Sequence, residues 1–339
     1  MRKLILALIF ATLAFAQDGA GPYKVLKTAK VGGAGGWDYV VADADGRKLY
    51  VARSGDGARI TVFNLDTLAP AGEIPGVSSH GVAISTKSGH GFASSKPITM
   101  FDSKTLAVIK KIDVEGNPDG LFYDAFTDRV LVLSHRAPHV TAINAADGTI
   151  AGTIDIGGMP EQAASDGKGH IYIDVEDKEN IAVIDAKALT VTAHYDIAGK
   201  GGTCAGLAMD VKNNLLFAMC RNPQNAVILN AADGKVISTL PIGQGTDGGG
   251  FNQSTLEAFS SQGDGTLTVI KVNSPTSFVV EQNVKTMSTA RTMTIDSKTG
   301  HVFLIGAEFG APTPPAQLGG RAGRGQMVPD SFAILEVGK

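Results

Sequence analysis

The sequence of 339 residues is poor in several residue types and patterns, and each scarcity excludes a class of protein. Two cysteines without a C-x-x-C pair give no cysteine zinc site and no c-type haem attachment site. Lys and Arg total 30 against 33 Asp and Glu, which is not the basic excess of a dedicated nucleic-acid binder. No 12-residue stretch after residue 20 keeps a 3.6-residue apolar period without Gly or Pro, which excludes a helical or doubly wound fold.

Short catalytic motifs are also missing. The sequence has no G-x-S-x-G, no H-E-x-x-H and no phosphate-binding loop. Residues 243–248 match G-x-G-x-x-G, but no helix is expected after them, so they do not predict a dinucleotide site. The absence of a nucleophile–base motif favours a binding protein over an enzyme.

The N-terminus has the three parts of an export signal. Met1-Arg2-Lys3 is positive, residues 4–15 are apolar, and Ala14-Phe15-Ala16 is a small-residue cleavage site. We expect a signal peptide over residues 1–16, a cut after Ala16, a short linker over 17–22 and a periplasmic or secreted product. The alternative is a buried N-terminal strand. No later apolar run reaches 18 residues, so no membrane span is expected.

A repeat of about 42 residues runs through the rest of the chain. Its marker is a short polar residue that follows an apolar strand and can start a turn by bonding its own backbone. The seven markers are Asp43, Ser85, Asp124, Asp166, Asp210, Asn252 and Asp296. Two more apolar runs and a hairpin turn such as Asp147-Gly148 follow in each repeat. Four short strands repeated seven times predict an all-β, seven-bladed β-propeller over residues 23–339.

The two ends of the chain complete one blade. The last repeat stops after its third strand, Phe332 to Val337, and Val25 to Gly32 matches the outer strand of a middle repeat. We therefore expect the N-terminal strand to close the last blade and remove the open sheet edges. About twenty extra residues, near 310–330, enter this blade between its second and third strands. They are either a surface loop or a lid on the face where the innermost strands begin.

Counting back five residues from each marker gives the start of every innermost strand, at one mouth of the central channel. These ring positions are Asp38, His80, Asp119, Glu161, Ala205, Asp247 and Arg291. Charged residues make up 19% of the chain, so about 1.3 of the seven would be charged by chance, and five are. The ends of the second strands add Arg53, His135, Glu176, Arg221 and Glu308 to the same mouth. We expect a negative mouth with few basic groups near Asp38, Glu161 and Asp247.

Crowded carboxylates either recruit a cation or raise one another's pKa values. The sequence thus predicts a ligand or divalent cation site (Ca²⁺, Mg²⁺ or Zn²⁺), with metal ligands among Asp38, Asp119, Glu161 and Asp247. The alternative is a structural ring whose charged groups bond backbone amides and channel water.

The two cysteines lie on neighbouring strands of the fifth repeat. Cys204 precedes the ring position and Cys220 ends the next strand. Antiparallel neighbours bring such positions within disulfide distance, and export favours oxidation. We predict a disulfide; a metal pair with a histidine is the alternative.

The blades resemble the YncE-like, YVTN-repeat β-propellers of exported bacterial proteins. The resemblance lies in Gly36-Trp37-Asp38-Tyr39 with residues 47–52, in residues 263–269, and in Ala290-Arg291-Thr292-Met293 with residues 307–310. It implies the propeller fold from about Tyr23 to Lys339 and little specific chemistry.

Three functions follow. The first is an exported, monomeric binding or scaffold propeller that holds a small ligand, cation or protein partner at the mouth. The second is a metal-assisted hydrolase or lyase of the lactonase type with His80 as acid/base. The third is nucleic-acid binding, against which the charge of −5 without residues 1–16 counts (28 Lys and Arg, 33 Asp and Glu).

Overall fold

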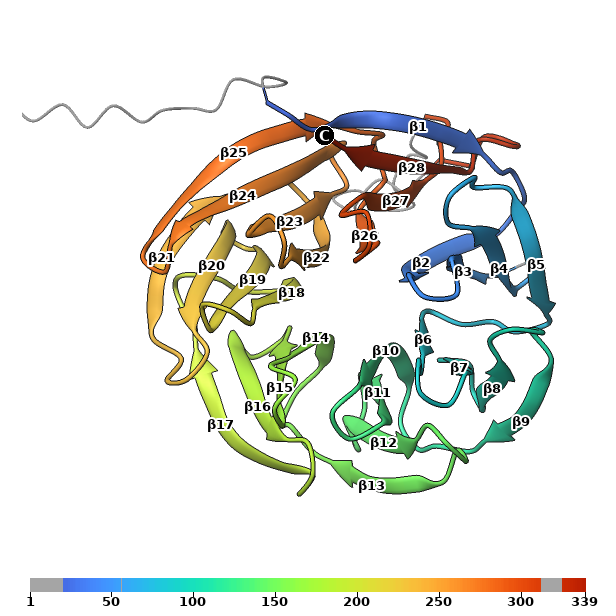
Figure 1. Ribbon diagram of the computed structural model, residues 1–339, viewed down its shortest axis with the longest axis horizontal. Coiled ribbons are helices and arrows are strands. Elements are labelled where there is room, and N and C mark those ends of the chain that lie inside the picture. The colour runs from blue at the N-terminus through green and yellow to red at the C-terminus, as the bar shows by residue number, and fades with distance from the viewer. Residues whose placement is uncertain (1–20, 56, 312–324) are drawn as a thin grey trace, which may run out of the picture.

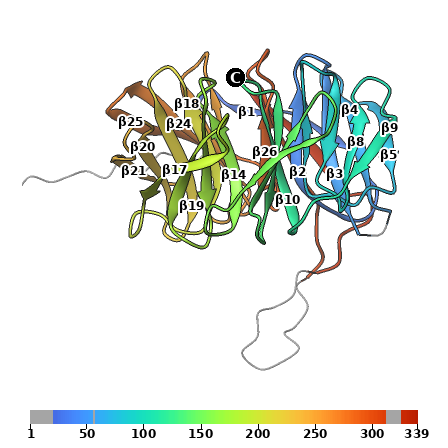
Figure 2. The same ribbon diagram turned by 90° about the horizontal axis from the view of Figure 1, so that it is seen from below.

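A computed structural model describes residues 21–55, 57–311 and 325–339. The chain forms a ring of seven four-stranded antiparallel sheets around a central channel (Figure 1). Seen edge-on, the ring is a disc (Figure 2). The predicted seven-bladed propeller is confirmed. The expected signal peptide and most of the linker lie outside the described residues.

Each of the first six blades takes four consecutive strands, from the channel outward. Blade one has β2 (Gly36–Asp43), β3 (Lys48–Ser54), β4 (Arg59–Asn64) and β5 (Pro70–Pro75). Blade two has β6 (Val82–Ile84), β7 (His90–Ala93), β8 (Ile98–Asp102) and β9 (Val108–Ile112). Blade three has β10 (Pro118–Asp124), β11 (Arg129–Ser134), β12 (Val140–Asn144) and β13 (Ile150–Ile154).

The next three blades repeat the pattern. Blade four has β14 (Pro160–Ser165), β15 (His170–Val175), β16 (Asn180–Asp185) and β17 (Thr190–Asp196). Blade five has β18 (Cys204–Asp210), β19 (Leu215–Arg221), β20 (Gln224–Asn230) and β21 (Val236–Pro241). Blade six has β22 (Thr246–Asn252), β23 (Glu257–Gln262), β24 (Thr266–Ser274) and β25 (Ser277–Lys285).

Blade seven joins the two ends of the chain. It has β26 (Thr292–Ile295), β27 (Val302–Gly306), β28 (Ala333–Gly338) and, outermost, β1 (Lys24–Lys30), which lies beside β28 in Figure 1. Tyr23, just before β1, is 4% exposed and donates its backbone N–H to the Gln282 side chain (2.9 Å). The N-terminal strand therefore closes the ring as predicted, and no blade is left with an unpaired third strand.

All seven repeat markers act as turn residues. Each accepts a hydrogen bond from a backbone N–H two or three residues later, which satisfies a donor that the turn would leave without a partner. The acceptors are Asp43, Ser85, Asp124, Asp166, Asp210, Asn252 and Asp296. These side chains set the residue at which each innermost strand ends. The ring position, near the start of that strand, lies five residues earlier.

The core consists of seven apolar clusters, one between each pair of neighbouring blades. Side chains alternate along the strands, so each strand serves two clusters. In β3, Leu49 and Val51 pack toward blade seven, whereas Tyr50 and Ala52 pack toward blade two. This alternation also decides which side chains at the strand ends can reach the channel.

The long connection of blade seven leaves the face where the innermost strands begin (Figure 2). Its two described arms, residues 307–311 and 325–332, pair through Phe309 and Met327. The Gly310 N–H donates to the Gln326 carbonyl (2.8 Å), and the Val328 N–H donates to the Glu308 carbonyl (2.8 Å). The middle of the predicted insertion, residues 312–324, lies outside the described residues.

The described residues include no helix with the length and apolar character needed to cross a membrane.

Candidate functional site

The mouth residues sit on interruptions of the strand pairing. In five blades the innermost strand holds extra residues at the ring position, so pairing with the second strand shifts there. The ring residues at these shifts are Asp38, Asp119, Glu161, Ala205 and Asp247. A bulge bends the strand and re-aims a side chain. The four charged side chains among them contact basic side chains at the mouth.

Blades one to four bring two histidines and three carboxylates together; we call this group the histidine half of the mouth. His80 Nδ1 lies 2.8 Å from Asp38 Oδ2 and 3.2 Å from Asp119 Oδ1. His135 Nε2 lies 3.4 Å from both Asp119 Oδ2 and Glu161 Oε2. Asp119 therefore belongs to two triads, each with one imidazole and two carboxylates.

The charges of the histidine half shift the pKa values of its members. The Glu161 carboxylate raises the pKa of His135 to about 9, although partial burial opposes this. The Asp38 carboxylate likewise raises the pKa of His80 above its ordinary value. Burial raises the pKa of Asp119 to about 6, and the nearby Glu161 and Asp38 add to the rise. The two histidines therefore hold their protons more tightly than a free imidazole does, and ionising Asp119 costs more free energy than ionising a free carboxyl group.

The other side of the mouth is organised by arginines; we call it the arginine half. Arg221 contacts Glu176 (Nη1 to Oε1, 2.8 Å) and Asp247, and its Nε donates to the Thr246 carbonyl (2.8 Å). Arg291 Nε lies 2.9 Å from the second Asp247 oxygen. Burial raises the pKa of Asp247 to about 6 against the pull of both arginines. Burial also raises the pKa of Glu176.

Asp247 is therefore not in the environment expected from the sequence. Two guanidinium groups occupy its two oxygens, and its side chain is only 8% exposed. A divalent cation there would meet two positive charges at contact distance. The expectation of few basic neighbours is wrong for Asp247, and the structure groups it with arginines and not with the other suggested cation ligands.

The second-strand ends divide into two groups. His135, Glu176 and Arg221 reach the mouth, as expected. Arg53 does not, because its backbone pairs with Trp37, one residue before the bulge, whereas Arg221 follows the equivalent Cys204–Cys220 pair. One residue of register turns a side chain to the opposite face.

Arg53 faces blade seven, with its guanidinium 3.7 Å above the Phe332 ring and hydrogen bonds to the carbonyls of residues 32–34. It is 1% exposed, and burial lowers its pKa to about 10. Its expected place at the mouth is wrong. Glu308 follows β27, is exposed, and pairs through its backbone with the far arm of the blade-seven connection.

Side chains next to the ring positions tie different blades together around the channel. The Tyr39 hydroxyl donates to the Glu161 carboxylate (3.1 Å) from the other side of the ring. The Gln162 side chain accepts from the Leu207 and Gly249 N–H groups and donates to the Gly249 carbonyl. Both residues line a channel cavity of about 260 Å³. Sequence reasoning missed them, although each directly follows a ring residue.

A buried carboxyl supports Glu161 and Gln162 from behind. Asp174, on β15, accepts the Gln162 backbone N–H through Oδ1 (2.6 Å) and is fully buried. Burial raises its pKa well above the ordinary value. Asp174 lies opposite the bulge that presents Glu161, so it helps to hold the bulge in place.

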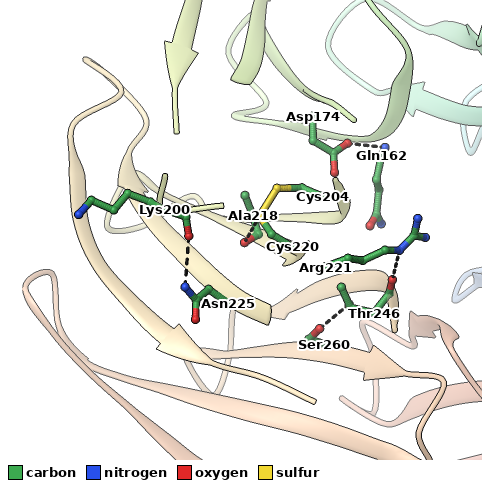
Figure 3. Close-up of a disulfide and its surroundings, with 10 residues drawn as sticks. All are labelled: Gln162, Asp174, Lys200, Cys204, Ala218, Cys220, Arg221, Asn225, Thr246 and Ser260. Atoms are coloured by element: carbon green, nitrogen blue, oxygen red, sulfur yellow. Dashed lines mark hydrogen bonds between the residues drawn. A yellow bond between two sulfur atoms is a disulfide. The ribbon is translucent and has the colours of Figure 1, made fainter. Parts of the chain in front are cut away.

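The two cysteines are joined. The Cys204–Cys220 disulfide links directly paired residues of β18 and β19, as predicted from the sequence (Figure 3). Arg221 is the next residue, and Figure 3 shows it extending from this strand end toward Thr246. The disulfide therefore fixes the strand end from which the central arginine of the mouth projects.

Both triads of the histidine half fit a metal ion by donor type, and the triad of His135, Asp119 and Glu161 also fits by spacing. In each triad the three ligand atoms lie within 4.8 Å of one another. His135 Nε2 is buried, and its ion-pair contacts with Asp119 and Glu161 do not meet hydrogen-bond geometry. Ligand atoms about 2.0–2.1 Å from a tetrahedral Zn²⁺ lie about 3.4 Å apart. That is the spacing from His135 Nε2 to the carboxylate oxygens of Asp119 and Glu161.

No protein-family model matches this sequence, and no curated protein matches it. Solved structures match the fold. One, described as the structure of U3-55K, has a TM-score of 0.72 at 10% identity and covers 94% of this chain and 99% of its own. Another, the crystal structure of the RRP9 WD40 repeats, has a TM-score of 0.73 at 11% identity, with 96% and 99% covered. The chain is thus a seven-bladed β-propeller similar in structure to WD40-repeat proteins, a scaffold commonly used for binding.

Proposed function

We propose that this propeller is a binding protein that holds a divalent cation in the histidine half of its mouth, where a small ligand or partner can reach it. The observation that carries the proposal is His135 Nε2, a buried nitrogen without a hydrogen bond, 3.4 Å from two carboxylate oxygens. A buried polar atom usually has a partner at hydrogen-bond distance, and here the two carboxylate contacts are too long for a good hydrogen bond. A cation between these three atoms supplies such a partner.

The donor set favours a transition metal over Ca²⁺ or Mg²⁺. Each triad offers one imidazole nitrogen and two carboxylate oxygens. Imidazole suits Zn²⁺ and its neighbours, whereas Ca²⁺ and Mg²⁺ prefer oxygen alone. Because both triads contain Asp119, a metal ion in one triad can exclude an ion from the other, or both triads can hold an ion at once. His135, Asp119 and Glu161 form the more buried triad, and we assign the tighter site to it.

Calorimetric titration tests this function. Zn²⁺, Ca²⁺ and Mg²⁺ are titrated into chelator-treated protein that lacks residues 1–16. We expect saturable binding of Zn²⁺ and at least about tenfold weaker binding of the other two. His135→Gln and Glu161→Gln should each weaken Zn²⁺ binding by about tenfold or more.

The matched control is His170→Gln. His170 also pairs with a carboxylate (Nδ1 to Asp166 Oδ2, 2.8 Å), but at the turn that ends the innermost strand, away from the mouth. This variant should bind Zn²⁺ like the parent. Parent protein without Zn²⁺ binding, or unaltered binding by both mouth variants, would overturn the proposal.

A second candidate function is metal-assisted hydrolysis of the lactonase type. The observation that favours it is the exposure of His80: half of its side chain is open to solvent while Nδ1 contacts Asp38 and Asp119. An imidazole at the rim of a cation site can move a proton to or from a bound substrate. A lactone panel with Zn²⁺-loaded protein and with His80→Gln decides between binding and catalysis.

We also propose that the protein is exported to the periplasm or outside the cell, as its resemblance to exported YncE-like propellers implies, and that it acts there as a monomer. The support is the sequence of residues 1–16 and the disulfide, since disulfides persist in oxidising compartments. N-terminal sequencing of the secreted protein tests this: a mature chain that starts at Gln17 supports export, and an intact Met1 argues against it.

A further inference from the structure

A separate cavity of about 320 Å³ lies beside the mouth, between blades one and seven. Gly35, Gly36 and Trp37 line it from the start of β2, and Arg291 lines it from just before β26. Phe309 and Met327, one from each described arm of the blade-seven connection, complete the wall. None of these residues except Arg291 belongs to the mouth network.

The walls of this side cavity are mostly apolar and aromatic. The Trp37 ring lies 6.0 Å from the Phe309 ring and 5.2 Å from the Phe332 ring, measured between centroids. Trp37, Phe309 and Met327 also pack against the apolar cluster between blades one and seven. A ring or a short aliphatic chain would find contacts on several sides here.

The polar groups of the side cavity are hydrogen-bond donors. Arg291 is 36% exposed, and among the described residues its guanidinium pairs with Asp247 alone, with Nε 2.9 Å from Oδ2. Trp37 Nε1 is buried and has no hydrogen-bond partner among the described residues. An indole nitrogen can only donate, and a guanidinium fork matches a carboxylate. Among the described residues that line the cavity, none carries a carboxylate.

We infer that this side cavity binds a small organic monocarboxylate with an aromatic or short aliphatic body. The carboxylate pairs with Arg291, and the Trp37 N–H gains an acceptor. The apolar body lies between Trp37, Phe309 and Met327. A volume of about 320 Å³ is at the small end of ligand pockets, which limits the ligand to roughly the size of phenylacetate or hexanoate. This site goes beyond the cation site and needs none of its ligands.

The chain carries its own probe for this inference, because Trp37 is its single tryptophan. Phenylacetate, hexanoate and the neutral phenylacetamide are titrated against Trp37 fluorescence in the presence of a chelator, and calorimetry repeats the measurement. We expect a saturable change with at least one carboxylate. Phenylacetamide should bind about tenfold more weakly or worse, because it lacks the charge that Arg291 recognises.

Arg291→Met should weaken carboxylate binding by about tenfold, and Arg291→Lys should give an intermediate loss because it keeps the charge but not the fork. The matched control is Arg129→Met, at the other end of the strands, where Arg129 bonds the Ala186 carbonyl. It should leave binding unchanged.

Three outcomes would each overturn the inference: no saturable signal with either carboxylate up to about 10 mM, equal binding of phenylacetamide, or parent-like binding by a folded Arg291→Met. Zn²⁺ titration of the same samples is independent. A failed cation site with intact carboxylate binding, or the reverse, shows which proposal is wrong.

Discussion

Both halves of the mouth are built around ring carboxylates, but different basic side chains contact these carboxylates in each half. In the histidine half, the carboxylates meet imidazoles at 2.8–3.4 Å, and one buried imidazole nitrogen lacks a hydrogen bond. In the arginine half, Asp247 is saturated by Arg221 and Arg291, and Arg221 is held further by Glu176 and the Thr246 carbonyl. One half is closed by its own partners, and the other has room for a cation. The chemistry of a ring carboxylate therefore depends on the basic side chains that contact it, which are His80 and His135 in one half and Arg221 and Arg291 in the other.

The largest expected effect is on the arginine half. Arg221→Met leaves Asp247 buried with one partner fewer, and breaking a buried ion pair is costly. We expect a loss of about 3 kcal/mol in the free energy of unfolding, measured by urea denaturation. His135→Gln should cost less than about 1 kcal/mol in the metal-free protein. Equal losses in the free energy of unfolding for Arg221→Met and His135→Gln would contradict the distinction between a closed half and an open half.

Removal of the disulfide should come next. Cys204→Ser with Cys220→Ser frees a loop of 16 residues and should cost about 3 kcal/mol by the same denaturation measurement. Zn²⁺ binding should be unchanged, because the triads lie in blades one to four. A double variant that folds but has lost Zn²⁺ binding would show that the halves are coupled.

A smaller effect concerns pH. The ordinary pKa of histidine is 6.5, and that of His135 is raised to about 9. The stability that His135 contributes is fully present below pH 6.5 and is lost as the pH rises through 9. With allowance for solvent screening, the metal-free protein should lose about 1 kcal/mol, or about 2 °C in Tm, over this range.

His135→Gln should flatten this part of the Tm profile, and His170→Gln should keep it. A profile that is equally steep in parent and His135→Gln would remove His135 as its origin.

The smallest effect should come from Tyr39, which positions Glu161 across the channel. Tyr39→Phe removes the hydroxyl that donates to both the carboxylate and the backbone carbonyl of Glu161, so we expect a loss of about 1 kcal/mol in stability and about threefold in Zn²⁺ affinity. Tyr172→Phe is the control, since its hydroxyl donates to the Ala231 carbonyl between blades four and five. It should lose similar stability without any change in Zn²⁺ affinity. Equal effects of both variants on affinity would contradict a positioning role for Tyr39.

Much of the fold follows from local chemistry, which is why the sequence predicted it. A turn residue must satisfy a nearby backbone N–H, so Asp43 and its six equivalents reveal the repeat and the ring positions five residues earlier. The disulfide follows from the same register, because Cys204 and Cys220 are directly paired.

The partners of the ring residues could not be predicted in this way. A bulge adds one residue to one strand only, so counting from the marker does not show which second-strand residue lies beside it. Arg53 belongs to the pair that flanks the bulge and faces Phe332, whereas Arg221 lies one residue beyond the equivalent pair and reaches Asp247. The contacts between His135 and Glu161 or between Arg291 and Asp247 join different blades, and no local pattern encodes such distances.

The most direct measurement is an anomalous difference map from crystals grown with Zn²⁺. We expect a peak about 2.0–2.2 Å from His135 Nε2 and from oxygens of Asp119 and Glu161. No peak is expected at Asp247, whose oxygens are contacted by Arg221 and Arg291. A mouth without zinc density, or a peak beside Asp247 in place of His135, would contradict the division of the mouth into an open and a closed half.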